Sequence, residues 1–390
     1  MTIKNKTLWS VRDIVFWLIF LLATISLLNI FGNGLTNVVA ATDRDCKIYG
    51  DFQEYYYPAA LTILKHPRPL GGYFYTPTFA ISLHYLIAGP LEKALIRWEL
   101  LQLLFLALIL IIPTFYLAEK SGKKLYGLLY TFFLVTSYAV FHNLKWGQVS
   151  ILITFLCIFS LILYDRKRRT VSALCLALAA TVKYYPGFLI LGFFIKKDWQ
   201  YLAWFSGFLL ILALIIPGAV LGFATTIEFY RLSLAEMSYA LDWVSGDINS
   251  QFFPHVLMRL FNLPAQTKGF LSLIGMLACL FVFFRIYKTH EDFDIEQFSQ
   301  LFLLVPFLIN TSWPHYFVFL PFCGIIALIK SQNSKAKILA CTALILQTIT
   351  MLAIFPSYKE YSFSGILLFS NILILISLNL RSETKVPGNK

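Results

Sequence analysis

Residues 165–197 read DRKRRTVSALCLALAATVKYYPGFLILGFFIKK, and the placement of charges in this stretch indicates how the chain crosses a membrane. Its interior is apolar, while both of its flanks are basic, Arg166–Arg169 before it and Lys196–Lys197 after it. Membrane proteins keep Lys and Arg in their cytoplasmic loops, so both flanks belong on the same side. The apolar run must therefore cross the membrane and return. Pro186 cannot continue a helix, which predicts a helical hairpin with Lys183 at its outer tip.

The same alternation of apolar runs and short basic linkers extends over the whole chain. Of its 390 residues, 58% are hydrophobic and only 13% are charged, whereas a soluble domain carries about 25% charged residues. The net charge of +12 comes from short runs such as Lys120–Lys124, not from one basic face. This distribution excludes a nucleic-acid-binding protein and favours a polytopic membrane protein whose basic linkers face the cytoplasm.

The apolar runs predict about twelve membrane-spanning helices, since one crossing needs ~20 apolar residues, and fewer inside a bundle. We expect one integral membrane domain over residues 1–380, a cytoplasmic tail at 381–390, and both termini in the cytoplasm. The first run is interpreted as a retained anchor, because no small-residue cleavage site follows it. The expected spans are 14–31, 98–118, 125–141, 148–164, 170–182, 184–195, 199–222, 270–287, 297–311, 315–330, 337–355 and 363–380.

Two short apolar stretches lie between the first two expected spans. The stretch 77–91 would form roughly 22 Å of helix, which is too short for a membrane core of ~30 Å. We expect it to lie on the outer interface together with the amphipathic stretch 51–65. The external loops 32–97 and 223–268 then hold most of the residues capable of chemistry.

Asp51 and Lys183 are the two charged residues with the strongest functional interpretation. A carboxylate such as Asp51, just outside a membrane helix, can act as a general base on a nearby hydroxyl. Its structural alternative is to cap the helix that it precedes. Lys183 interrupts an apolar run, where a charge is costly and usually faces a cavity or a partner, such as a lipid phosphate. The alternative for Lys183 is snorkelling to the outer headgroups.

Other polar residues lie at the expected outer ends of the spans. Gln148 begins a span, His315 follows Trp313 before another, and Asn249 belongs to a polar run upstream of Arg259. Arg259 can pair with phosphate through its guanidinium group. The structural alternatives are helix-start polarity for Gln148, an interfacial position for His315, and loop capping for the run that contains Asn249.

The absence of several sequence motifs narrows the function classes. The sequence has no Walker loop, no nucleotide-binding glycine fingerprint, and no CxxC motif or Cys/His cluster. It therefore predicts neither an ATP motor nor a metal site. A transporter or lipid flippase is the alternative to a membrane enzyme, and a non-catalytic membrane partner is a third interpretation. Transporters place charges near the membrane midplane in paired repeats, whereas here the polar groups gather on one face and no repeat is visible.

Six motifs occur together in this chain in a characteristic order. They are Asp51–Tyr56 (DFQEYY), Tyr73–Pro77 (YFYTP), Trp146–Gln148 (WGQ), Thr181–Pro186 (TVKYYP), Asn249–Ser250 with Arg259, and Ser312–His315 (SWPH). Together they resemble glycosyltransferase family 87, polytopic enzymes of the GT-C fold that include polyprenol-phosphate-mannose-dependent mannosyltransferases. The resemblance covers most of residues 45–330.

The resemblance implies an all-α bundle in the plasma (inner) membrane that acts on its extracytoplasmic side. A hexose would pass from a polyprenyl-phosphate donor to a hydroxyl of a lipid or glycan acceptor, with inversion of the anomeric configuration. Mannose is the hexose that the family resemblance favours. No nucleotide or other cofactor is implied, and we expect no obligatory metal ion, although Asp43 and Asp45 leave metal binding open. The implied roles are Asp51 as general base, Lys183, His315 and Arg259 as contacts of the donor phosphate, and Tyr75, Gln148, Asn249 and Trp313 as substrate-binding residues.

Overall fold

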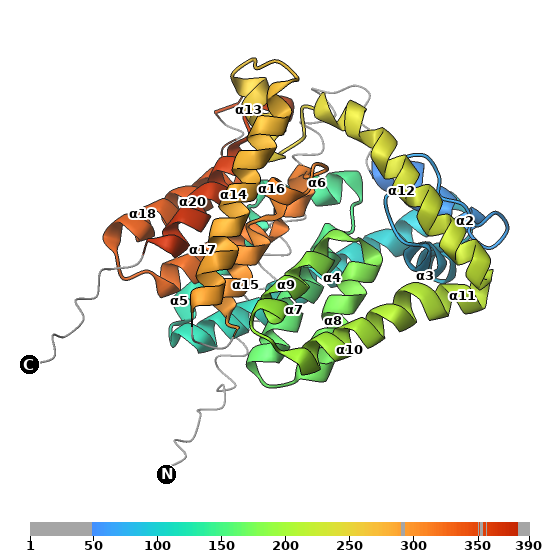
Figure 1. Ribbon diagram of the computed structural model, residues 1–390, viewed down its shortest axis with the longest axis horizontal. Helices are drawn as coiled ribbons and strands as arrows, with labels where there is room; N and C mark the ends of the chain where they lie inside the picture. The colour runs from blue at the N-terminus through green and yellow to red at the C-terminus, as the bar shows by residue number, and fades with distance from the viewer. Residues whose placement is uncertain (1–48, 290–292, 350, 352–353, 356, 381–390) are drawn as a thin grey trace, which may run out of the picture. The chain divides into compact units, whose positions relative to one another are not determined.

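The structure is a computed structural model that describes residues 49–289, 293–349, 351, 354–355 and 357–380. This part of the chain is helical almost throughout (Figure 1), which confirms the all-α class. Its strand-like pairing is an isolated bridge between Ser137 and Thr348. The expected span 14–31 and the tail 381–390 lie outside the described residues.

Both short helices expected in the first external loop are present. The stretch after Asp51 forms η1 (Phe52–Tyr56) and α2 (Tyr57–Thr62), and the next apolar stretch forms α3 (Pro77–Ile87). Thr76 caps α3, because its hydroxyl accepts a hydrogen bond of 3.3 Å from the Phe79 backbone N–H. The position of these helices on the membrane interface stays a prediction.

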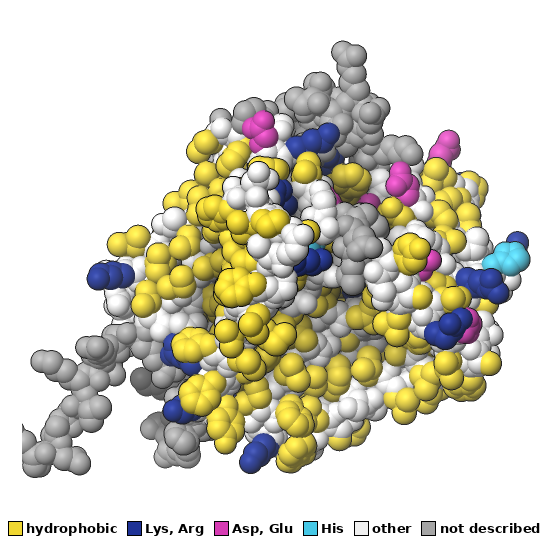
Figure 2. Space-filling model, turned by 45° about the horizontal axis from the view of Figure 1, so that its top comes forward, with side chains coloured by type: hydrophobic (Ala, Val, Ile, Leu, Met, Phe, Trp, Pro, Cys, Tyr) yellow, Lys and Arg dark blue, Asp and Glu magenta, His cyan; other side chains and the backbone are white. Residues whose placement is uncertain are grey.

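Three helices in the described residues are long and apolar enough to cross a membrane. They are α4 (Leu91–Ser121), α14 (Thr267–Lys288), and the continuous helix Trp199–Leu221 formed by α10 (Trp199–Leu210), η3 (Ile211–Ile215) and α11 (Ile216–Leu221). The outer face of α14 is apolar, with Phe270, Leu277, Phe281 and Phe284 exposed. Hydrophobic side chains also cover much of the face in Figure 2. These features indicate a multi-pass membrane protein.

Several expected spans are broken into shorter helices. The run 125–141 divides into α5 (Lys124–Val135) and α6 (Tyr138–Trp146), and 297–311 divides into α15 (Ile295–Phe302) and α16 (Val305–Leu308). At the first break, the Tyr138 N–H bonds to the Gln347 carbonyl at 2.9 Å, outside its own helix. The number of crossings, about twelve by sequence, therefore stays a prediction.

The remaining helices complete the described part of the chain. They are α7 (Ser150–Asp165), α8 (Arg169–Val182), η2 (Tyr185–Leu189), α9 (Ile190–Ile195), α12 (Phe223–Ser245), α13 (Phe253–Leu260), η4 (Pro314–Phe319), α17 (Leu320–Lys330), α18 (Ser334–Leu346), α19 (Tyr358–Phe363) and α20 (Ile366–Asn379).

The hairpin predicted from residues 165–197 is confirmed. Asp198, at the start of α10, forms an ion pair of 3.7 Å with Arg169, at the start of α8. The same carboxylate accepts a hydrogen bond of 2.8 Å from Tyr164 at the end of α7. The chain thus leaves along α8, turns at Lys183, and returns through η2 and α9 to the point where it began.

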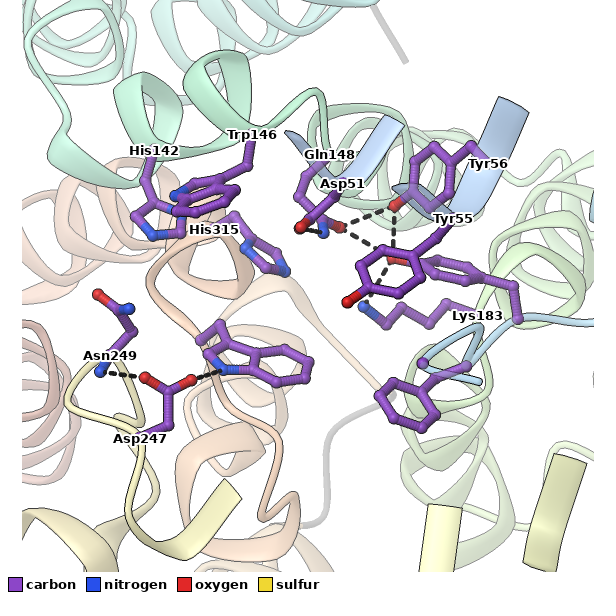
Figure 3. Close-up of a pocket in the computed structure, with 14 residues that line it drawn as sticks. Asp51, Tyr55, Tyr56, His142, Trp146, Gln148, Lys183, Asp247, Asn249 and His315 are labelled. Carbon is purple, nitrogen blue, oxygen red and sulfur yellow. Dashed lines mark hydrogen bonds between the residues drawn. The ribbon is translucent and has the colours of Figure 1, made fainter. Parts of the chain in front are cut away.

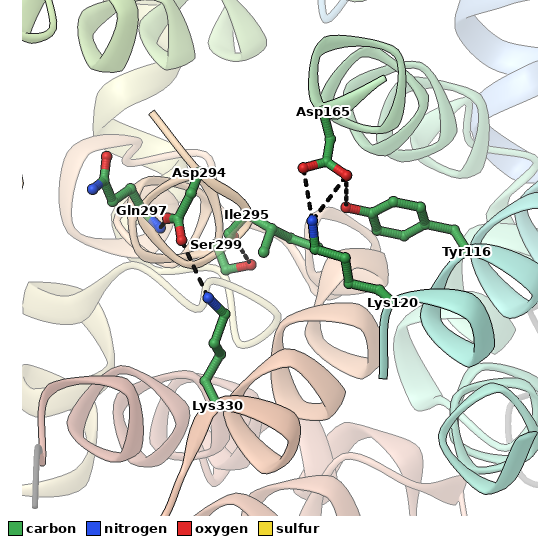
Figure 4. Close-up of polar contacts among 8 residues, drawn as sticks. All are labelled: Tyr116, Lys120, Asp165, Asp294, Ile295, Gln297, Ser299 and Lys330. Atoms are coloured by element: carbon green, nitrogen blue, oxygen red, sulfur yellow. Dashed lines mark hydrogen bonds and ion pairs between the residues drawn. The ribbon is translucent and has the colours of Figure 1, made fainter. Parts of the chain in front are cut away.

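The basic linkers lie together at one end of the helices (Figure 4). Lys120 pairs with Asp165 at 2.8 Å, and Lys330 pairs with Asp294 at 3.3 Å. Such partly exposed pairs contribute only about 0–1 kcal/mol each, so they locate the linkers more than they drive folding. Lys183 ends α8, roughly 21 Å of helix away from this charged end. The structure therefore separates the basic linkers from the hairpin tip.

Small residues allow the helices to pack closely, as is common between membrane helices. A Cβ atom on Gly127 of α5 would lie 2.6 Å from the Thr114 carbonyl oxygen of α4, so only glycine fits there. Beside this contact, the hydroxyls of Thr114 and Thr131 share a hydrogen bond of 2.7 Å. This close packing holds α5 against α4, and α5 is followed directly by α6.

Candidate active site

A cavity of about 190 Å³ lies among the helix ends at the hairpin tip (Figure 3). Every site residue predicted from the sequence lines it except Arg259. The lining residues are Asp51, Tyr55, Tyr56, Gly72, Phe74, Tyr75, His142, Trp146, Gln148, Lys183, Asp247, Asn249, Trp313 and His315. Residues from all six of the quoted motifs thus meet in one place.

The glycine of the WGQ motif brings Asp51 to Gln148. Gly147 ends α6 with a φ of 67°, in the left-handed region that favours glycine. A Cβ atom at this position would lie 3.0 Å from the Cβ of Phe52, so the first loop packs directly on Gly147. Its carbonyl also accepts a hydrogen bond of 3.0 Å from Trp98 of α4. These contacts explain why residues from the first loop and from the start of α7 share the cavity.

Gln148 links Asp51 to two buried tyrosines. Its side-chain N–H donates a hydrogen bond to the Asp51 carboxylate. Its side-chain carbonyl accepts hydrogen bonds from Tyr56 and Tyr75, each at 2.8 Å. The two tyrosine hydroxyls are 2.5 Å apart. Asp51 makes no side-chain capping hydrogen bond to η1, so its carboxylate does not serve as a helix cap here.

The environment of Asp51 favours its protonated form more than water does. Burial raises the pKa of the Asp51 carboxyl to about 6, although the hydrogen bond from Gln148 and the charge of Lys183 act in the opposite direction. A carboxylate with such a pKa is ionised at neutral pH and is also basic enough to accept a proton from a hydroxyl.

Lys183 is enclosed by aromatic rings at the hairpin tip. Its side chain is only 4% exposed, which differs from a snorkelling lysine whose ammonium reaches the surface. The ammonium lies 4.3 Å from the ring centroid of Tyr316 and 4.7 Å from that of Tyr75, and it donates a hydrogen bond of 3.2 Å to the Tyr75 hydroxyl. Among the described residues, none of the ion pairs includes Lys183. Burial lowers the pKa of the Lys183 ammonium to about 7, although the charge of Asp51 acts in the opposite direction. An anion in the cavity would hold the side chain in its charged form.

The position of Tyr75 beside Lys183 follows from a contact between two helix ends. The hydroxyl of Thr76, which begins α3, donates a hydrogen bond to the Thr181 carbonyl in the last turn of α8. Tyr75 precedes this contact and Lys183 follows it. The pair of threonines thus holds the YFYTP and TVKYYP motifs together.

The opposite wall contains His142, which the sequence interpretation missed, and residues of two segments that it had singled out. His142 and Trp146 of α6 and Asp247 after α12 line the cavity beside the predicted His315 and Asn249 (Figure 3). His142 comes directly after the expected span 125–141, so its place at an expected outer helix end was the available signal. Asp247 accepts a hydrogen bond of 2.7 Å from the Trp313 indole, which fixes that ring in the wall.

Arg259 lies outside the cavity and stabilises the backbone around it. Its guanidinium group donates to the carbonyls of Asp247 at 3.3 Å and Ser250 at 3.1 Å. It also bonds to the carbonyls of Ser362 and Phe363 in α19. The guanidinium donors of Arg259 therefore bind the backbone of the loop that contains Asn249, which differs from the phosphate contact expected from the sequence.

The fold and the cavity define a membrane-embedded protein with a polar site at one end of its helices. A comparison with protein families matches residues 73–311 to Glycosyltransferase family 87. The chain belongs to this family and is a glycosyltransferase, as the sequence motifs predicted. A search of curated proteins returned no match to the chain. Asp51, Trp313 and His315 lie outside the matched residues, so their inclusion in the site depends on the cavity geometry.

Proposed function

We propose that this protein transfers a hexose, with mannose as the first choice, from a polyprenyl-phosphate donor to a hydroxyl of a lipid or glycan acceptor. The observation that carries the proposal is the shared cavity of Asp51 and Lys183, a base and a cation far apart in the sequence. Transfer between a phosphate-linked sugar and an alcohol needs a base beside the attacking hydroxyl and a cation beside the departing phosphate, on the two sides of the anomeric carbon.

Asp51 acts as the general base in this proposal. The acceptor hydroxyl gives its proton to the Asp51 carboxylate as its oxygen attacks the anomeric carbon of the sugar. The bond from that carbon to the phosphate oxygen breaks in the same step, and polyprenyl phosphate leaves with the electron pair. A single displacement of this kind inverts the anomeric configuration. Gln148 holds the Asp51 carboxylate through its N–H hydrogen bond.

Lys183 and His315 stabilise the phosphate as negative charge develops on the leaving group. The buried Lys183 ammonium lies in an aromatic enclosure in which water competes little for an anion. Tyr75 bonds to Lys183, while Asn249 and Trp313 line the same cavity and bind substrate. A polyprenyl-phosphate leaving group requires no bound nucleotide for this chemistry.

The arrangement of the site favours an enzyme over a transporter. The lining residues lie at helix ends and in loops at the hairpin-tip end, such as Gln148 before α7 and Lys183 after α8. The other ends of these two helices carry the exposed ion pairs. A site confined to one end suits group transfer on one membrane face. We place this end on the extracytoplasmic side, with about twelve spans in a GT-C-type bundle and both termini in the cytoplasm.

The test is incubation of the purified full chain with polyprenyl phosphates that bear mannose, glucose or another hexose, together with membrane lipid extracts as acceptors. Mass analysis of the lipids should reveal a new hexosylated product and free polyprenyl phosphate in equal amounts. If no donor gives a product while a nucleotide sugar does, the proposed donor class is wrong.

A further inference from the structure

Four rings form a continuous wall of the cavity, from Trp146 to Trp313. Trp146 and His142 have ring centroids 6.0 Å apart. His142 stacks on His315 at 5.5 Å with an interplanar angle of 29°, and His315 stacks on Trp313 at 6.0 Å. The ammonium of Lys183 lies 5.9 Å from the Trp313 ring, so the wall begins beside the proposed phosphate position and leads away from it.

This wall carries polar atoms without protein partners. Within the described part of the chain, neither ring nitrogen of His142 or of His315 has a hydrogen bond. The same holds for the indole nitrogen of Trp146 and the side-chain oxygen of Asn249. His142 is only 4% exposed and His315 only 2%. Buried polar atoms are nearly always bonded, and each one left without a partner costs about 1–3 kcal/mol.

The concentration of such atoms in one cavity indicates a ligand that supplies several donors and acceptors at once. A neutral imidazole offers one donor and one acceptor, and burial favours the neutral form of histidine. A sugar hydroxyl also donates and accepts, so it matches His142 better than an anion does. The Asp247 carboxylate lies on the same side of the cavity, bonded to the Asn249 N–H at 2.8 Å, and would repel an anion there.

The order of the groups along the wall then places the two parts of the donor. Lys183 provides a cation at one end, while His142, Trp146 and Asn249 provide uncharged polar atoms and an aromatic face further along. A hexose linked to a phosphate near Lys183 would lie along the ring wall, with its hydroxyls facing these atoms.

We propose that His142, with Trp146 and Asn249, binds the hydroxyl groups of the transferred hexose and determines which sugar is accepted. This inference rests on the proposed function, because the hexose reaches the wall as part of a polyprenyl-phosphate donor. It assigns to His142 a direct contact with substrate.

The experiment compares two lipid probes on the full chain in lipid nanodiscs. One probe is polyprenyl phosphate bearing mannose or glucose, and the other is the same polyprenyl phosphate without sugar. His142→Phe keeps a ring in the stack but removes both nitrogens. It should weaken binding of the tighter sugar-bearing probe by about tenfold or more, a loss of about 1.4 kcal/mol or more. Binding of polyprenyl phosphate should stay within about twofold.

Two further variants make the result specific to hydrogen bonding. His142→Gln keeps a donor and an acceptor and should restore most of the affinity for the sugar-bearing probe. His84→Phe changes a histidine that bonds to the Ala60 carbonyl outside the cavity and should leave both affinities unchanged.

The possible failures are distinguishable. Equal losses for both probes in His142→Phe, or an unchanged affinity for the sugar-bearing probe, would overturn the sugar-binding role of His142 while leaving the donor class intact. If the wild-type protein binds neither probe, the proposed function fails, and the inference that depends on it fails as well.

Discussion

The side-chain amide of Gln148 donates a hydrogen bond to the carboxylate of Asp51. Because the carbonyl of the same side chain accepts from Tyr56 and Tyr75, Gln148 is bonded within the protein at both of its polar atoms. Tyr75 in turn accepts from Lys183. This network connects the proposed base to the proposed phosphate contact, so Gln148 is a positioning residue for Asp51 in our account.

Replacement of Gln148 by leucine should lower the transfer rate and change its pH dependence. The hydrogen bond from Gln148 lowers the pKa of Asp51, so its loss should shift the acid limb of kcat/KM to higher pH. We expect kcat to fall by roughly tenfold to a hundredfold, since a hydrogen bond to a charged group contributes about 1.5–3 kcal/mol. Gln297→Leu, at a buried glutamine of α15 outside the cavity, is the control. A slower enzyme with an unmoved acid limb would refute the link to Asp51.

The wild-type enzyme should lose activity in mild acid. Burial raises the pKa of Asp51 to about 6, and only the ionised carboxylate can accept the acceptor's proton. The value of kcat/KM should therefore rise with pH through about 6 and fall about tenfold for each pH unit below it. A pH–rate profile from pH 4.5 to 7 measures this limb below the pH at which Lys183, whose pKa burial lowers to about 7, loses its charge. A flat profile over that range would argue against a carboxylate base.

Replacement of Lys183 by alanine should weaken the use of the donor. Lys183 is a buried cation that faces the cavity without an ion-pair partner among the described residues, so its removal leaves a phosphate without its counter-charge. We expect kcat/KM for the polyprenyl-phosphate donor to fall by about a hundredfold or more, as when a charged hydrogen bond is lost.

Lys120→Ala is the matched control for this prediction. It removes an ion pair of 2.8 Å with Asp165 at the opposite end of the helices. Donor kinetics of that variant should match the wild type. If Lys120→Ala and Lys183→Ala impair donor use equally, the effect of Lys183 is structural and the phosphate contact is wrong.

Arg259→Met should destabilise the protein more than it impairs donor use. Arg259 bonds to carbonyls of the loop at Asp247 and Ser250 and of α19, and it does not line the cavity. Loss of these bonds should lower the thermal unfolding temperature, with a change in donor KM below about threefold. Unfolding assays and donor titrations on the same preparation decide the point. A variant with unchanged stability and a strongly raised KM for the donor would show instead that Arg259 contacts the donor phosphate.

The sequence predicted the hairpin and the gathering of its motifs because charge placement is a strong constraint in membranes. Basic flanks on both sides of residues 170–195 required a return path, and the contact of Arg169 with Asp198 confirms it. The position of Lys183 at the tip followed from the same argument. Asp51, Gln148 and His315 were each expected at an outer helix end, and all three line one cavity.

Other features depend on tertiary contacts that a linear pattern does not contain. The break between α5 and α6 is stabilised by a bond from Tyr138 to Gln347, far away in the sequence. The guanidinium group of Arg259 was expected to contact phosphate, but it donates hydrogen bonds to backbone carbonyls of α19. His142 was missed because its importance comes from the stack with His315, which no local spacing reveals.

The most direct test of the central claim is the rate of hexose transfer by Asp51→Asn under saturating polyprenyl-phosphate donor at pH 8. The amide keeps the size of the side chain but cannot accept the acceptor's proton. We predict a rate at least about a hundredfold below that of the wild type, with donor affinity retained. A transfer rate within twofold of the wild type would contradict the account, because the reaction would then proceed without its proposed base.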